Sequence, residues 1–177
     1  MPAYVWNGSA WKKVLRKTMW TGTAWKDIKS SHRWTGSAWE TIYSSFMSSG
    51  MTKNGNWAPG TTYPWVTISG WTADAGSTVV SDGVTVRGTK SDAVVTSQVR
   101  VRNAASGGNE CAVRLLVAGS VVKTGSIITF TGGQTQNLTL TSDPTSVVTD
   151  QIATVQIQGQ YGRLEVQSGT DTWVRIT

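Results

Sequence analysis

The sequence has one cysteine and one histidine among its 177 residues, and this scarcity excludes several kinds of site. A single cysteine, Cys111, cannot form an internal disulfide, and its place in an alternating apolar run predicts a small buried side chain rather than a reactive thiol. Zinc sites built from cysteine and histidine need three or four ligands, which one chain cannot supply. His32 stands in the basic segment 30–33, where we expect a solvated loop residue rather than a catalytic base.

Long hydrophobic runs and a secretory signal are missing as well. No apolar stretch approaches the ~20 residues that a membrane-spanning helix needs, so we expect no membrane partner. The start Met1-Pro2-Ala3-Tyr4 lacks the basic, apolar and small-residue segments of a signal peptide, which predicts assembly in the cytoplasm of the producing cell. The composition, 38% hydrophobic and 15% charged, is that of a folded chain.

Candidates for catalysis are also scarce. The acidic residues after position 53 are scattered in turns such as 81–83, 142–144 and 149–151, and turn formation explains them as well as catalysis does. The glycine pairs of the second half lack the strand-to-helix context of a phosphate-binding loop. We therefore predict a non-enzymatic protein with no catalytic residue, no metal site and no cofactor.

The net charge of +6 is concentrated near the N-terminus. Residues 1–53 contain eight basic and two acidic residues, whereas the remainder is neutral with eight of each. The basic residues between the tryptophans predict a face that docks on an acidic protein surface or stays solvated: Lys12, Lys13, Arg16, Lys17, Lys26, Lys29 and Arg33. We do not expect nucleic-acid binding, because the aromatics stand in turn-flanking pairs and no recognised nucleic-acid motif is present.

An internal repeat fills the first 43 residues. The segments Trp-Asn-Gly-Ser-Ala-Trp, Trp-Thr-Gly-Thr-Ala-Trp and Trp-Thr-Gly-Ser-Ala-Trp recur with a period of 14 residues. Their tryptophans are Trp6, Trp11, Trp20, Trp25, Trp34 and Trp39. Gly8, Gly22 and Gly36 supply the positive φ of a tight turn, so each copy predicts one β-hairpin with its two indoles paired across the strands.

A hairpin of 14 residues cannot bury two indoles by itself. Neighbouring repeats, the same repeats of sister chains, or another protein could cover them. Alternatively, the paired tryptophans stack on sugar rings, which would make the array a carbohydrate-binding module for host cell-wall glycan. Tyr161 and Trp173 are further aromatic candidates for such a ligand.

From about residue 65 the pattern changes to alternating strands with no stretch at helical period. About eight short strands within 65–177 predict a β-sandwich of the jelly-roll kind. For example, Val95, Ser97, Val99 and Val101 are expected to face one way. Serines, glycines and prolines within 44–64 predict a linker between the repeats at 1–43 and the sandwich.

The tryptophan repeats resemble units found in minor tail and other virion proteins of tailed phages. The second half is similar to the trimeric jelly-roll heads that end phage fibres, notably over Val99-Arg100-Val101-Arg102 and residues 114–122. The resemblance implies a structural virion component, a minor tail protein or fibre-like appendage attached through its repeats to other virion proteins. It also implies a homotrimer. A capsid decoration or head fibre protein is the alternative within this class.

Overall fold

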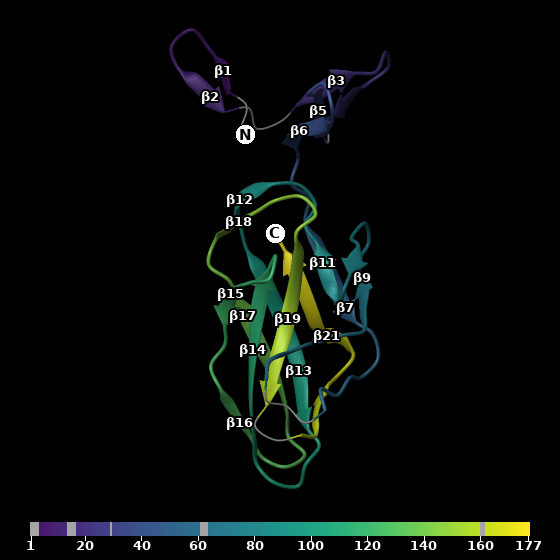
Figure 1. The fold of residues 1–177 in the computed structure, drawn as a ribbon, viewed down its shortest axis with the longest axis vertical. Helices are drawn as coiled ribbons and strands as arrows, with labels where there is room; N and C mark the ends of the chain where they lie inside the picture. Colours follow the sequence, from purple (N-terminus) through teal and green to yellow (C-terminus); the bar gives the residue numbers. More distant parts are fainter. Residues whose placement is uncertain (1–3, 14–16, 29, 61–63, 160–161) are drawn as a thin grey trace. The chain divides into compact units, whose positions relative to one another are not determined.

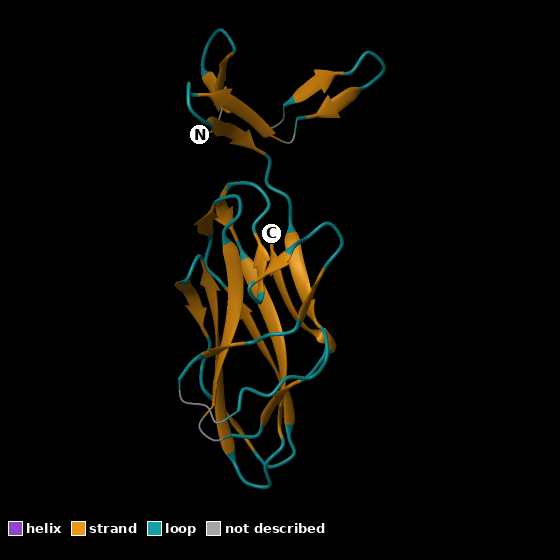
Figure 2. Cartoon of the chain, turned by 45° about the vertical axis from the view of Figure 1, so that its right-hand side comes forward, coloured by secondary structure: helices purple, strands orange, loops and turns teal. Residues whose placement is uncertain are grey.

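The computed structural model describes residues 4–13, 17–28, 30–60, 64–159 and 162–177, and the chain divides into two compact units, Met1–Phe46 and Met47–Thr177. All the described elements are strands (Figure 2). The prediction of an all-β chain with a β-sandwich is confirmed. No helix long and apolar enough to cross a membrane occurs within the described ranges.

The first unit contains three separate antiparallel hairpins (Figure 1). They are β1 (Tyr4–Trp6) with β2 (Trp11–Lys13), β3 (Thr18–Trp20) with β4 (Trp25–Asp27), and β5 (Ser30–Trp34) with β6 (Trp39–Ser44). The third hairpin is longer, because pairing continues past a bulge between Ser31 and His32 as far as Ser30 and Ser44. His32 therefore lies on β5, and the prediction that it sits in a loop is wrong. Backbone pairing with β6 makes a strand of this polar segment, although its side chains give no strand pattern.

The second unit contains two main sheets that lie face to face in Figures 1 and 2. The seven-stranded sheet has the order β10-β11-β19-β14-β15, with β16 pairing β14 and β8 pairing β19. Its strands are β8 (Val66–Thr67), β10 (Val79–Val80), β11 (Gly83–Thr85), β14 (Asn109–Val117), β15 (Ser120–Thr124), β16 (Ile128–Phe130) and β19 (Ile152–Gly159).

The six-stranded sheet has the order β17-β13-β21-β7-β9, with β20 pairing β13. Its strands are β7 (Ser49–Lys53), β9 (Trp71–Ala73), β13 (Val95–Asn103), β17 (Thr135–Thr141), β20 (Leu164–Val166) and β21 (Gly169–Ile176). A further pair, β12 (Lys90–Ala93) with β18 (Thr145–Val147), stands apart from both sheets.

Period-two alternation builds the core between the two sheets. On β13 the residues Val95, Ser97, Val99 and Val101 are all fully buried, and the residues between them are not, as the sequence predicts. Val155 and Ile157 of β19 are equally buried, so both sheets contribute aliphatic side chains. Cys111 on β14 is 1% exposed, and burial raises the pKa of its thiol to about 12. The prediction of a buried cysteine is confirmed.

The predicted linker over 44–64 differs from the structure. β7 lies inside this range, pairs with both β21 and β9, and has four of its five residues buried. Trp57 also forms a backbone bridge with Val166. The serines and glycine that suggested a linker are accommodated because neighbouring strands supply the hydrogen bonds and the cover.

Candidate docking site on the tryptophan hairpins

Each hairpin places its two tryptophans directly opposite one another. The registers pair Trp6 with Trp11, Trp20 with Trp25, and Trp34 with Trp39. The ring centroids within the three pairs are 5.7, 5.7 and 5.5 Å apart, and the ring planes are inclined by 56°, 55° and 55°. Tilted pairs at this separation are favourable by ~0.5–1.5 kcal/mol beyond burial. The predicted cross-strand pairs are therefore present in all three hairpins.

The turns explain why the three pairs are alike. Gly8, Gly22 and Gly36 have φ values of +98°, +92° and +98°, in the left-handed region that glycine adopts without strain. The amide of the residue before each glycine donates to the carbonyl two residues after the glycine, at 2.9–3.2 Å. In the first turn the side chain of Asn7 also accepts a hydrogen bond from the amide of Ala10 at 2.9 Å. Turn geometry, fixed by local sequence, thus fixes the position of the indoles.

All six indoles are exposed in the single chain. The first tryptophan of each pair is 51%, 54% or 52% exposed, and the second is 68%, 67% or 71% exposed. The difference recurs in every copy, so the three pairs present the same shape: one more prominent indole supported by its partner. The array itself leaves these large apolar surfaces uncovered.

The tilt between the rings limits what each pair can bind. Two coplanar rings would form a flat platform for consecutive sugar rings, and planes inclined by about 55° do not. A tilted, protruding pair has the shape of a wedge. A wedge fits a pocket on a partner surface, where tryptophan is among the residues that contribute most to binding.

Three of the predicted basic residues lie on the other face of the hairpins from the indoles. Lys12, Lys26 and Arg33 are each adjacent in sequence to a strand tryptophan, and successive side chains of a strand point to opposite faces. Their backbone partners are Val5, Met19 and Glu40. The indoles and these cations therefore do not form one mixed surface.

For two of the other predicted basic residues, the structure gives the position of the backbone. Lys17 precedes β3, and its carbonyl accepts a hydrogen bond from the amide of Ile28 at 2.8 Å. Lys13 belongs to β2, where the structure gives its backbone pairing with Tyr4. Arg16, Lys29 and the glycan candidate Tyr161 lie outside the described residues.

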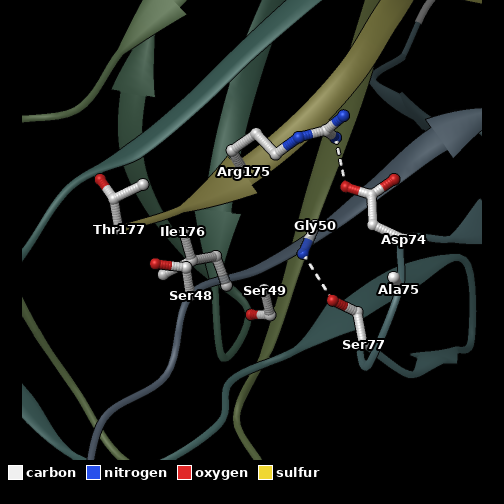
Figure 3. Close-up of a pocket in the computed structure, with 9 residues that line it drawn as sticks. All are labelled: Ser48, Ser49, Gly50, Asp74, Ala75, Ser77, Arg175, Ile176 and Thr177. Atoms are coloured by element: carbon white, nitrogen blue, oxygen red, sulfur yellow. Dashed lines mark hydrogen bonds and ion pairs between the residues drawn. The ribbon is translucent and has the colours of Figure 1, made fainter.

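A cavity of about 170 Å³ lies in the second unit, where β7 begins and β21 ends (Figure 3). Asp74 accepts from Arg175 Nη1 at 2.9 Å and from Thr52 Oγ1 at 3.0 Å, so both carboxylate oxygens are engaged. The amide of Gly50 donates to Ser77 Oγ at 2.9 Å. These contacts tie β7, β21 and the turn after β9 together. The arrangement is suited to a structural role.

Within the residues that the structure describes, no group of three or more histidine, cysteine, aspartate or glutamate side chains is arranged to hold a metal ion.

Sequence comparison leaves the family open, and structural comparison identifies the fold. No family model and no curated protein matches the sequence. Among solved structures, Eiger TNF from S. frugiperda aligns with a TM-score of 0.52 at 10% identity, over 74% of this chain and 90% of its own. Murine APRIL aligns with a TM-score of 0.45 at 13% identity, over 75% and 98%. A carbohydrate-binding module of Cellvibrio mixtus lichenase 5A, in complex with cellotriose, aligns with a TM-score of 0.31 at 13% identity, over 72% and 95%. The likeness to the TNF structure shows that this chain contains a β-sandwich of the jelly-roll kind.

Proposed function

We propose that this chain is a non-enzymatic structural component of a tailed-phage virion, a minor tail protein or fibre-like appendage. The hairpin repeats attach it to another virion protein, and the β-sandwich unit is the part that is attached. The observation that carries this proposal is the exposure of six indoles in three geometrically equal pairs. Exposed apolar groups of this size are characteristic of interaction surfaces. A capsid decoration or head fibre protein would use the same attachment.

The charge of the array indicates the kind of surface to which it docks. The excess of basic over acidic residues is confined to the N-terminal part of the chain. Lys12 and Lys26 are exposed on strands whose other face bears the indoles. A partner that holds a hairpin from both sides, with apolar pockets for the indoles on one side and carboxylates facing the cations on the other, complements both features.

Incorporation into particles tests the attachment. We expect the triple variant Trp11→Ala, Trp25→Ala, Trp39→Ala, tagged and supplied during assembly, to be recovered in purified particles at about a tenth or less of the wild-type amount, because hot-spot tryptophans each contribute ~2 kcal/mol or more. A matched control is Ile127→Ala, which removes a side chain 69% exposed on the second unit. Incorporation of the triple variant at the wild-type level would contradict the proposal.

A second candidate function follows from the same exposure, in which each exposed indole stacks on one sugar ring by itself, because the tilted pair offers no flat platform. If the paired tryptophans bind host cell-wall glycan, adding purified cell-wall fragments shifts the tryptophan emission of the full chain to shorter wavelength. The triple variant then loses this shift. If the fragments leave the emission spectrum unchanged, the indoles do not bind cell wall. That result favours docking on another protein of the particle.

A further inference from the structure

The outer face of the six-stranded sheet carries a straight row of side chains, one from each strand of its main path. The row consists of Thr139 on β17, Gln98 on β13, Trp173 on β21, Thr52 on β7 and Thr72 on β9. The registers pair each member directly with the next. Because strands in a sheet are about 4.8 Å apart, the row is about 19 Å long.

The alternation of burial places this row on the outside of the sandwich. Its members are exposed or partly exposed, whereas their strand neighbours Leu138, Val99, Val174 and Met51 are buried in the core. Trp173 stands at the centre, with an amide side chain next to it on one side and a hydroxyl side chain on the other. The row thus combines one aromatic surface with flanking hydrogen-bonding groups.

Neighbouring charges on this face are paired. Arg100 Nη1 lies 2.5 Å from Asp171 Oδ2, and Arg175 Nη1 lies 2.9 Å from Asp74 Oδ2. Paired charges leave the surface close to neutral, so it does not match a polyanion.

Polar contacts hold the three central members of the row in place. Gln98 Nε2 donates to the carbonyl of Asp171 at 3.0 Å, and Thr52 Oγ1 donates to Asp74 Oδ1 at 3.0 Å. The guanidinium carbon of Arg175 lies 5.4 Å from the centroid of the Trp173 ring, within range of a cation–π contact. Side chains fixed in this way lose little further freedom when a ligand binds.

The surface also differs from a protein docking site. The exposed large hydrophobic side chains found among the described residues of this unit lie on other segments: Met47, Val80, Val121, Ile127 and Val148. An indole flanked by hydroxyl and amide groups, with the Arg175 guanidinium over one part of its ring, is instead complementary to a sugar. The ring C–H groups of a sugar pack on the exposed part of an aromatic ring while its hydroxyls exchange hydrogen bonds with polar side chains.

We propose that this face of the second unit binds a neutral oligosaccharide, with one sugar ring on Trp173 and the chain running along the row. The site is separate from the tryptophan hairpins. The chain would then have two recognition surfaces, one for attachment and one for carbohydrate.

Spectra of the full-length protein titrated with oligosaccharides test this proposal. We would record ¹H–¹⁵N spectra with chitotetraose, cellotetraose and maltotetraose. At least one should shift the indole N–H of Trp173 together with the amides of Gln98 and Thr52. Trp173→Ala should abolish the shifts. Since that variant removes a partly buried ring, Thr139→Lys and Thr72→Lys provide a second test at exposed positions, and each should weaken binding about tenfold or more by obstructing the row.

Thr124→Lys is the matched control, because Thr124 is exposed on β15 of the other sheet. It should leave binding unchanged. The proposal is overturned if none of the three oligosaccharides shifts these signals at millimolar concentration, or if Thr124→Lys weakens binding as much as Thr139→Lys. Shifts confined to the hairpin indoles would also overturn it. Particle incorporation should be unaffected by Thr139→Lys, so failure of this site and failure of attachment are distinguishable.

Discussion

Two buried serines have opposite hydrogen-bonding environments. Ser97 is fully buried in the middle of β13, and its hydroxyl has no partner among the described residues. Ser142 is 4% exposed, and its hydroxyl accepts a hydrogen bond from the amide of Val95 at 2.9 Å. Alternation along β13 predicted that Ser97 faces inward, but no sequence pattern distinguishes a satisfied hydroxyl from an unsatisfied one.

We therefore expect alanine substitutions at these two serines to have different effects on stability. Ser97→Ala removes a buried polar group that makes no bond, so the free energy of unfolding should stay unchanged or rise by up to ~1 kcal/mol. Ser142→Ala leaves the amide of Val95 without its acceptor and should lower that free energy by ~1–3 kcal/mol. Urea unfolding of both variants measures the difference. Equal losses would mean that Ser97 does have a partner in solution.

Lys53 illustrates a residue whose role the sequence does not reveal. It counts among the basic residues of the N-terminal part, yet it is 4% exposed within the second unit. Its amine donates to the carbonyls of Asn54, Gly55 and Gly70 at 2.7–3.1 Å. Burial lowers the pKa of this amine, and the nearby charge of Asp82 opposes that shift. Lys53 therefore holds a turn together and is not part of a docking surface.

At the scale of the element, the hairpins follow from local sequence and β7 does not. Trp-x-Gly-x-Ala-Trp contains the turn, the paired aromatics and their register within six residues, so the geometry of each pair was predictable. The segment 49–53 reads Ser-Gly-Met-Thr-Lys, which has low strand propensity. It becomes a strand because β21, more than a hundred residues away, pairs with it. The transverse row through Trp173 was unpredictable for the same reason, since it depends on registers between five distant strands.

Two fragments of the chain test how much β7 contributes to the stability of the second unit. We expect residues 47–177 to fold cooperatively, because this range forms one compact unit. A fragment of residues 65–177, the domain that the sequence predicts, lacks β7 and with it the strand between β21 and β9. Loss of the fully buried Met51 alone should destabilise by ~2–5 kcal/mol. Circular dichroism and thermal unfolding distinguish the two fragments, and a shorter fragment as stable as the longer one would show that β7 is dispensable.

For the whole molecule, the two units differ in size, charge and the amount of apolar surface that they leave exposed. The first unit is small, basic and presents uncovered indoles, whereas the second has an extensive aliphatic core and paired surface charges. Small hairpins with exposed indoles gain stability when a partner covers the indoles, whereas a unit with its own aliphatic core is stable by itself.

The homotrimer that the resemblance implies gives a prediction for the whole molecule. If the sandwich units associate, light scattering should give three times the 19.0 kDa of one chain for the full-length protein. The fragment 47–177 should likewise be trimeric, and the triple tryptophan variant should keep the full mass. A monomeric mass for the fragment at micromolar concentration would contradict association through the sandwich, and a trimer that depends on the tryptophans would assign it to the hairpins.

The pairing of Ser49 with Ile176 has a consequence for how the second unit can be rearranged. The first and last strands of this unit are antiparallel neighbours, so its chain enters and leaves at adjacent points about 5 Å apart. A short glycine bridge could close these ends, and new termini could be opened in the tight turn at Ala118 and Gly119, between β14 and β15. Circular permutation would thus keep every strand in its place. A polypeptide fused after Thr177 would emerge beside the entry point. The loop between β13 and β14 lies at the opposite end of β13 from the strand pair with Ile176, so it would stay uncovered.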